Sequence, residues 1–249
     1  MNILITAGGT CEDIDSVRGI SNHATGRLGS IISDTFVNAG WKATYICGET
    51  ATPPKANAEI LRVRDVNGLT ATLSSVLHKE KFDCVVHSMA VSDYTPQLAI
   101  TVDEMASNIM SALSAPNIQG HDTHEIIKRA VYGSRALIGN KISSKSDLVL
   151  LLKKTPKVIS QIKAIQPNTM LVGFKLLSGA AEEELLKASQ NLLEQNACTF
   201  VLANDLKNIS NDIHKAILID KAGILGRANT KQEIAGLIFK YVSERHGVS

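Results

Sequence analysis

The sequence predicts an α/β protein with a Rossmann-like, mostly parallel sheet, helices on both faces and a late antiparallel hairpin. Short apolar runs rich in β-branched residues alternate with helical segments, which favours a parallel sheet with right-handed crossovers. Hydrophobic residues make up 44% of the chain and aromatic residues only 4%. This composition is typical of buried parallel strands built from aliphatic side chains.

The individual elements follow from the apolar runs and the spacing between them. The expected strands are Asn2–Ala7, Ala43–Cys47, Ile60–Val63, Cys84–His87, Met170–Phe174, Thr199–Ala203 and Ala216–Ile219. The expected helices are Gly26–Ala39, Val66–His78, Thr123–Ala130, Ser146–Leu152, Pro156–Ile165, Ala180–Gln195 and Lys231–Arg245. The last expected strand follows closely on the one before it and ends near Lys221-Ala222-Gly223, which predicts the hairpin.

We expect residues 1–249 to form a single nucleotide- and substrate-binding domain with one insertion at about 95–140. Breaks such as Thr95-Pro96 and Ala115-Pro116-Asn117 interrupt the periodicity there. A stretch of that length is more than a plain connection. It is a flap over a site, an oligomer contact or a partly disordered segment, and the sequence does not choose among the three.

Composition excludes several classes of function. The formal charge of +2 is too balanced for a nucleic-acid or membrane partner. Cys11, Cys47, Cys84 and Cys198 form no CxxC pair, so we expect reduced thiols in a cytoplasmic protein rather than a metal site or disulfide framework. The chain starts directly with the strand-like Asn2–Thr6, so no secretory signal is expected, and no apolar run has the length of a membrane span.

The first expected strand leads into Gly8-Gly9-Thr10. Paired glycines allow backbone N–H groups to approach an anion, and a following helix N-terminus adds a favourable dipole, so the loop is a candidate phosphate cradle. The alternative is a tight turn that ends the strand. The dinucleotide fingerprint GxGxxG is absent.

A long polar loop precedes the helix expected at Gly26, at the edge of the sheet where open α/β proteins bind ligands. Arg18 can pair with a phosphate or carboxylate, and the Asn22 amide can donate to a developing oxyanion. Asn22 and Thr25 could instead cap the helix. We favour the cap for Thr25 and the site for Asn22.

In their order along the chain these residues resemble the opening of phosphopantothenoylcysteine synthetases: a strand, GGT, an acidic residue, an Asp, VR-x-I-x-N and a glycine-flanked turn. The corresponding residues are Gly8-Gly9-Thr10, Glu12, Asp15, Val17-Arg18, Ile20, Asn22-His23 and Gly26–Gly29.

Later segments extend the resemblance over most of the chain. His87–Tyr94 is similar to the family's AVADY motif, which implies that Ser88, Met89 and Ala90 read a pyrimidine base. It also implies that Ala90 contacts substrate and that Asp93 faces the nucleotide or its metal. Asp93 could instead be a turn carboxylate. The other matching segments are Lys141-Ile142, Lys154–Ile159 with Pro156 starting a helix, Gly173-Phe174 and Asn204-Asp205.

The resemblance implies a ligase that joins 4′-phosphopantothenate to L-cysteine through an acyl-cytidylate made from CTP. Asn22, Arg18 and Lys141 would be catalytic, and Arg18, Asn22 and Ala90 would bind substrate. It further implies Mg²⁺ bound through the triphosphate and possible use of ATP, no flavin, a homodimer and a separate decarboxylase partner in the pathway. The implied nucleotide-binding residues are Gly8, Gly9, Thr10, Ser88, Met89, Ala90, Asp93, Lys141, Pro156, Lys157, Val158, Ile159 and Phe174.

The sequence departs from the compact members of this family in its longer segment at 95–140, in Ala24 and in its lysines. Compact members carry two lysines on the helix before the AND motif, whereas Lys187–Asn196 has none after Lys187. Lys175 or Lys187 would have to supply the missing phosphate contact. Thr25 could replace the serine that Ala24 displaces.

Two other functions fit parts of the sequence. A short-chain NAD(P)H reductase would need TGxxxGxG and YxxxK, but the glycine spacing is wrong and Tyr132 is followed four residues later by Ala136. A non-catalytic nucleotide-binding module would tolerate the polar loop. It gives no reason for Arg18, Asn22, Asp93 and Lys141 to occur together.

Overall fold

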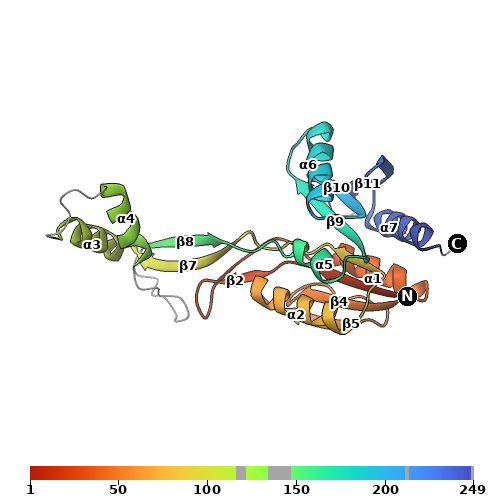
Figure 1. The fold of residues 1–249 in the computed structure, drawn as a ribbon, viewed down its shortest axis with the longest axis horizontal. Helices are drawn as coiled ribbons and strands as arrows, with labels where there is room; N and C mark the ends of the chain where they lie inside the picture. The colour runs from red at the N-terminus through yellow and green to blue at the C-terminus, as the bar shows by residue number, and fades with distance from the viewer. Residues whose placement is uncertain (116–121, 134–146, 211–212, 248–249) are drawn as a thin grey trace. The chain divides into compact units, whose positions relative to one another are not determined.

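The structure is a computed structural model that describes residues 1–115, 122–133, 147–210 and 213–247. The chain divides into two compact units (Figure 1). The larger comprises residues 1–10, 22–91 and 157–249, and the smaller comprises residues 11–21 and 92–156.

An eight-stranded sheet forms the larger unit, with the strand order β12-β11-β10-β9-β6-β1-β4-β5. The six strands from β10 to β5 are parallel, and β11 and β12 each pair antiparallel with the neighbour before them. The predicted fold class and the late hairpin are therefore confirmed. The strand bounds are β1 (Asn2–Ala7), β4 (Lys42–Gly48), β5 (Glu59–Val63), β6 (Cys84–His87), β9 (Met170–Leu177), β10 (Phe200–Ile209), β11 (His214–Asp220) and β12 (Gly223–Ala228).

Helices cover both faces of this sheet because alternate strand residues point to opposite sides. On one face, α1 (Arg27–Asn38) and α7 (Lys231–His246) pack over Ile3 and Ile5, and the Phe36 and Phe239 rings meet edge to face at 5.1 Å. On the other, α2 (Val66–Lys79), α5 (Ile159–Ile165) and α6 (Glu182–Gln195) pack over Leu4 and Val85.

The smaller unit contains two antiparallel strand pairs and two helices. β7 (Tyr94–Thr101) pairs with β8 (Leu148–Lys154), and β2 (Cys11–Asp13) pairs with β3 (Gly19–Ser21). The helices are α3 (Val102–Leu113) and α4 (Thr123–Tyr132). The described part of the expected insertion at 95–140 lies in this unit, and its role as flap or interface stays a prediction.

The helix expected at Ser146–Leu152 is wrong: Leu148–Lys154 is strand β8. The physical reason is its partner, because β7 pairs with it from Tyr94 to Thr101 and overrides the helical propensity of a leucine-rich run. The starts of two other helices also differ. α5 begins at Ile159 rather than Pro156, and the Thr155 hydroxyl donates to Ser92 O. Gly26, at φ 73°, precedes α1 as its N-cap, and Thr25 Oγ1 lies 3.4 Å from Arg27 N.

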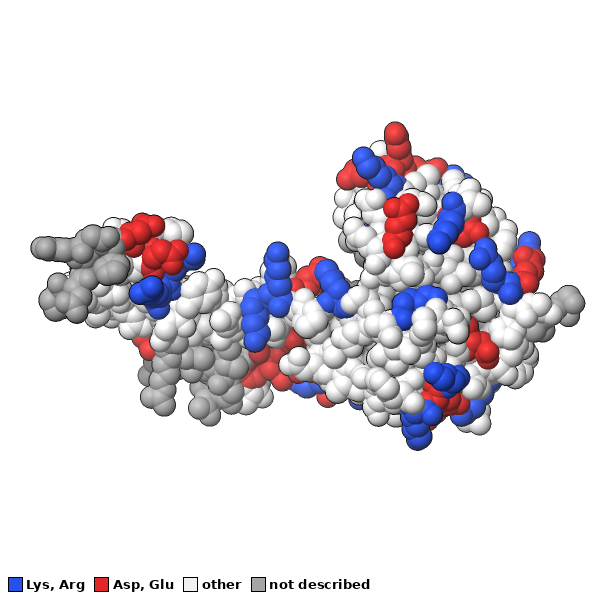
Figure 2. Space-filling view, in the orientation of Figure 1, with Lys and Arg blue, Asp and Glu red and all other residues white. Residues whose placement is uncertain are grey.

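The surface charges, the cysteines and the helix lengths bear on the expectations from composition. On the face drawn in Figure 2, basic and acidic side chains are interspersed over the larger unit. Cys47, Cys84 and Cys198 are buried thiols. No helix of the described residues combines the length and apolarity needed to cross a bilayer.

Packing of α2 provides a direct test of the core. Its Asp65 N-cap accepts from Gly68 N at 2.7 Å, and its buried residues recur every four positions at Leu69, Leu73 and Leu77. Leu73 is fully buried. We expect Leu73→Ala to lower the free energy of unfolding by about 2–5 kcal/mol, because it removes transfer energy and leaves a cavity. Urea unfolding measures this, with the exposed Ser75→Ala as control. Equal stability of the two variants would contradict the packing.

Candidate functional site

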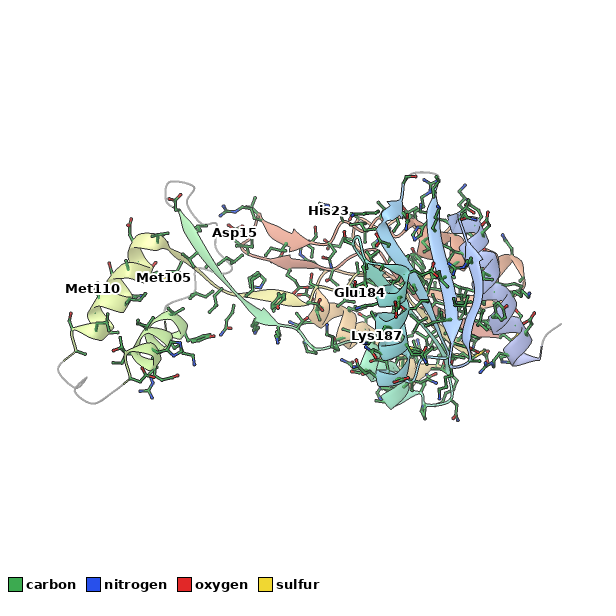
Figure 3. The ribbon with its side chains drawn as sticks, turned by 90° about the horizontal axis from the view of Figure 1, so that it is seen from above. Asp15, His23, Met105, Met110, Glu184 and Lys187 are labelled. Atoms are coloured by element: carbon green, nitrogen blue, oxygen red, sulfur yellow. The ribbon has the colours of Figure 1, made fainter. Side chains whose placement is uncertain are left out.

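A cavity of about 300 Å³ lies in the larger unit at the carboxyl ends of β1, β6, β9 and β10. This is the edge at which open parallel sheets bind ligands. One wall comes from the segment that leads into α1, which includes His23 (labelled in Figure 3). The lining residues are Gly8, His23, Ala24, Thr25, Gly26, Arg27, Leu28, Gly29, Ser88, Met89, Ala90, Phe174, Leu176, Asn204, Leu206, Ile209, His214 and Lys231.

The glycine loop continues the pairing of β1 beyond the end of the strand. Ala90 N donates to Gly8 O at 2.8 Å, and Thr10 N donates to Ala90 O at 3.3 Å. Gly8 has a φ of 78°, which favours glycine. Gly8 therefore lines the cavity, while Gly9 and Thr10 lie beside Ala90 in strand-like pairing.

Backbone hydrogen bonds also fix the segment Ser88–Ala90. The N–H and the hydroxyl of Ser88 both donate to Thr6 O, at 3.0 and 2.8 Å, and Met89 N lies 3.4 Å from Thr6 Oγ1. The Thr6 hydroxyl also lies 2.8 Å from His87 Nδ1. Because that hydroxyl accepts from Met89, its own hydrogen is free to donate to His87. Ser88 and Met89 thus share Thr6 as a support, and Ala90 is held by Gly8.

Asn22 is joined to this segment through its side chain. Its Nδ2 donates to Ala90 O at 3.1 Å, although the residue itself is exposed. Two of the residues expected to bind substrate, Asn22 and Ala90, are therefore in contact. The next residue, His23, lines the cavity.

The lining is cationic. Arg27 and Lys231 carry positive charge, and no aspartate or glutamate is present among the described residues that line the cavity. Burial, followed by the nearby Lys231 charge, lowers the pKa of His214 to about 4, so the ring is neutral at pH 7. His214 Nε2 lies 3.3 Å from Asn204 Nδ2. Such a cavity suits an anionic ligand.

Some expected site residues lie in the smaller unit. There Arg18 binds Asp15 Oδ2 through Nη2 at 2.6 Å and Nε at 3.1 Å, while Asp15 Oδ1 accepts from Val17 N and Arg18 N. The backbone oxygen of Asp93 accepts from Thr155 N, one residue before Pro156. The roles of Arg18, Asp93 and Pro156 toward a ligand stay predictions.

Of the other expected residues, Phe174 lines the cavity. Val158 is buried and Ile159 half-buried in the core under α2, whereas Lys157 is exposed. Lys141 lies outside the described residues, so its role also stays a prediction. Neither Lys175 nor Lys187 lines the cavity; Lys187 is on the exposed side of α6 (Figure 3).

Arg27, His214 and Lys231 were not predicted as site residues from the sequence. Arg27 and Lys231 could have been noticed as basic residues at the starts of two expected helices, where Arg27 is the second residue of Gly26–Ala39 and Lys231 is the first of Lys231–Arg245. His214 gave no such signal, because it comes to the cavity through the antiparallel return of β11 along β10.

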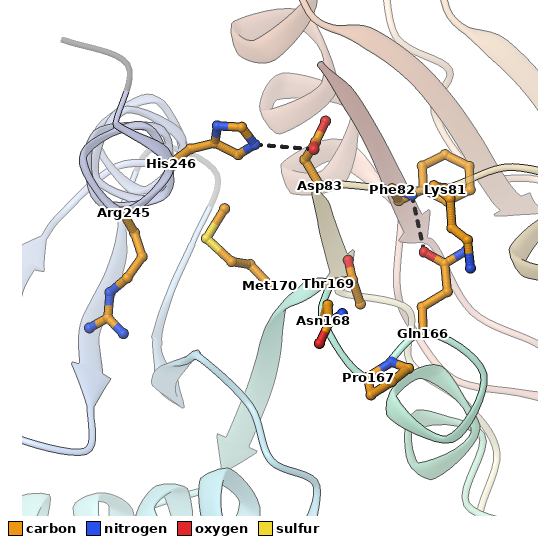
Figure 4. Close-up of a pocket in the computed structure, with 10 residues that line it drawn as sticks. All are labelled: Lys81, Phe82, Asp83, Gln166, Pro167, Asn168, Thr169, Met170, Arg245 and His246. Atoms are coloured by element: carbon orange, nitrogen blue, oxygen red, sulfur yellow. Dashed lines mark hydrogen bonds and ion pairs between the residues drawn. The ribbon is translucent and has the colours of Figure 1, made fainter.

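A second cavity, of about 500 Å³, lies at the opposite edge of the sheet, where β6 and β9 begin (Figure 4). Three of its ionic groups are in ion pairs: His246 with Asp83, and Arg245 with Asp220, both at 3.1 Å. Because ligands bind at the carboxyl ends of the strands in such sheets, we assign the site to the first cavity. The second is lined by Lys81, Phe82, Asp83, Gln166, Pro167, Asn168, Thr169, Met170, Arg245 and His246.

The glycine loop depends on a close approach from β4. A Cβ added at Gly48 would collide with Gly9 O. We therefore expect Gly48→Ala to displace the loop, costing about 1–3 kcal/mol of stability and weakening binding of the expected nucleotide, CTP, measured by calorimetry. Gly236→Ala is the control, because a Cβ on this α7 residue meets nothing within 4 Å. Wild-type CTP affinity in Gly48→Ala would show that the approach is unimportant.

Buried His87 makes stability depend on pH. It is 7% exposed, and burial lowers its pKa from 6.5 to about 4. The unfolded chain therefore binds the proton more tightly, so the stabilisation is present above about pH 6.5 and is lost as the pH falls toward 4. We expect His87→Gln to remove about 2 kcal/mol of the decline in unfolding free energy between pH 7 and 5. The exposed His78→Gln should keep the wild-type decline; identical pH profiles for all three proteins would refute the assignment.

Comparison with known proteins gives matches along the whole chain. A family model described as "DNA/pantothenate metabolism flavoprotein C-terminal domain" matches residues 1–106 and 99–245. A solved Streptococcus pneumoniae structure with the description "DNA/Pantothenate Metabolism Flavoprotein" is similar at 35% identity with a TM-score of 0.82, covering 99% of this chain and 100% of that one. A structure of a CoaBC C-terminal domain, at 20% identity and a TM-score of 0.68, shares the fold.

Curated relatives are longer than this chain. The bifunctional coenzyme A biosynthesis protein CoaBC of Thermococcus kodakarensis is 31% identical over 94% of the chain and 48% of the relative. That of Bacillus subtilis is 33% identical over 83% of the chain and 40% of the relative. The chain thus spans about half the length of the curated relatives it matches.

Proposed function

The chain belongs to the family of the DNA/pantothenate metabolism flavoprotein C-terminal domain, and on that premise we propose that it is a phosphopantothenate–cysteine ligase. The observation that carries the proposal is the cationic cavity, whose walls come from the segments that match the synthetase motifs: Gly8, Ser88–Ala90, Phe174 and Asn204. Relatives named for coenzyme A biosynthesis support the same reaction.

The reaction needs two displacements. A carboxylate oxygen of 4′-phosphopantothenate attacks the α-phosphorus of CTP, and pyrophosphate leaves. The cysteine amine then attacks the acyl carbon of the cytidylate, loses a proton and displaces CMP. Neither step transfers electrons, so the proposal includes no flavin. Nor does either step need a protein nucleophile.

Asn22 is suited to the second step. One N–H of its amide is committed to Ala90 O at 3.1 Å, and an amide nitrogen has a second hydrogen to donate. That second hydrogen would stabilise the oxyanion formed as cysteine attacks, because a preorganised donor acts where charge develops. Arg18 would position the acid substrate, and Lys141 would follow the charge on departing pyrophosphate.

The base would be read by carbonyl groups. The N–H groups of Ser88, Met89 and Ala90 all donate within the protein, whereas a carbonyl oxygen can accept a further hydrogen bond. The carbonyls of Ser88 and Met89 therefore favour a base with an exocyclic amine. Cytosine and adenine both carry an exocyclic amine. We prefer CTP because of the resemblance to the synthetase motifs, and ATP is the alternative.

When bound, Mg²⁺ held through triphosphate oxygens would neutralise charge on the leaving group, with Asp93 as the proposed protein contact. The product keeps the cysteine carboxylate, so a separate decarboxylase would act on it next, as the fused relatives suggest. A homodimer and a cytoplasmic location complete the proposal.

The direct experiment is a coupled pyrophosphate assay with CTP or ATP. We expect release to require the nucleotide and 4′-phosphopantothenate together, with CTP the better substrate. Release without the acid, or tight binding of a nicotinamide cofactor instead, would contradict the ligase.

Asn22→Asp separates the two steps. The carboxylate cannot donate to Ala90 O or to the oxyanion, so we expect cytidylate formation to continue while conversion to product slows by about 10²–10³-fold. Single-turnover quenching measures pyrophosphate and product separately. A normal rate for the second step would remove Asn22 from this role.

A further inference from the structure

Asn204, His214 and Lys231 form one side of the cavity at the antiparallel end of the sheet. Asn204 is on β10, His214 opens β11, and Lys231 opens α7. His214 N donates to Asn229 O at 2.7 Å, which fixes the start of β11 against the residues before α7. Three elements therefore converge on the same wall.

The His214 ring has an unsatisfied nitrogen. The residue is 7% exposed, and its Nδ1 is buried without a hydrogen-bond partner among the described residues. Buried polar atoms in native proteins nearly always have a partner. If Asn204 Nδ2 donates to Nε2 across their 3.3 Å contact, the ring proton must be on Nδ1. Asn204 then holds the ring in the form that can donate.

We propose that Asn204, His214 and Lys231 are a phosphate-binding wall, in which Lys231 supplies the opposite charge and a small movement of the His214 ring brings its buried Nδ1–H to a phosphate oxygen. The inference rests on the proposed function for the source of that phosphate. It is either the triphosphate of the nucleotide or the 4′-phosphate of the acid substrate, and the chemistry of recognition is the same.

Local charge supports this assignment. Asp205, the carboxylate next to Asn204, is occupied elsewhere: it accepts from the N–H groups of Gly179, Ala180 and Lys207. Glu233 on α7 accepts from Asn229 N and so is held at the helix start. The wall thus keeps its positive charge. It also offers cationic contacts in a chain that lacks the lysines expected before the AND motif.

The test compares Lys231→Gln and His214→Leu with Lys215→Gln. Lys215 is an exposed neighbour on β11 that does not line the cavity, so its variant makes the same charge change outside the wall. Calorimetry would use four probes: CTP, CMP, 4′-phosphopantothenate and pantothenate. We expect both wall variants to weaken one phosphorylated ligand on the order of tenfold, the size of one charged hydrogen bond. The wall variants should bind the less phosphorylated counterpart of that ligand with wild-type affinity. Lys215→Gln should bind all four probes with wild-type affinity.

The pattern identifies the phosphate. A loss confined to CTP over CMP assigns the wall to the triphosphate, and a loss confined to 4′-phosphopantothenate over pantothenate assigns it to the 4′-phosphate. Equal affinities in Lys231→Gln and Lys215→Gln, or equal losses for ligands with and without the phosphate, would overturn the wall. Binding is measured without turnover, so a wild-type protein that binds both ligands but releases no pyrophosphate would refute the ligase alone.

Discussion

The site depends on the close backbone approach where β1, β4 and β6 end. Ala90 O accepts from both Thr10 N and Asn22 Nδ2, and Ala90 N donates to Gly8 O. One residue thereby joins the glycine loop, the segment expected to read the base and the end of the polar loop. A side chain at Gly48 would collide with Gly9 O, so the arrangement requires glycine on the neighbouring strand. The three motifs are separate in sequence, but they meet at this one contact.

Two buried histidines perform different tasks near this contact. Burial keeps both rings neutral, with pKa values of about 4. His87 interacts with the Thr6 hydroxyl that supports Met89, so it belongs to the framework. His214 lines the cavity and has a buried nitrogen without a described partner. The difference in hydrogen bonding, rather than in pKa, separates a supporting histidine from one available to a ligand.

The parallel strands were predicted well from the sequence, because short apolar runs such as Cys84–His87 are typical of strands that are buried on both faces of a sheet. The prediction failed at Leu148–Lys154, where pairing with β7 decides the structure of a run that would otherwise favour a helix. The phosphate role of Gly8–Thr10 stays a prediction, and the structure adds that Thr10 N pairs with Ala90. Motif order predicted the family but not these local partners, which depend on residues far away in sequence.

His214 and Lys231 show why part of the cavity was not predicted from the sequence. Neither residue belongs to a recognised motif, and they come together only because the chain returns antiparallel along β10 before α7 begins. The parallel strands carry the family motifs and the reacting groups they imply. Strand β11 and helix α7 add a neutral histidine and a cation, with no carboxylate in the described lining. If the proposed wall binds phosphate, substitutions there would change which phosphate is held, and how tightly, without disturbing the backbone contact at Ala90.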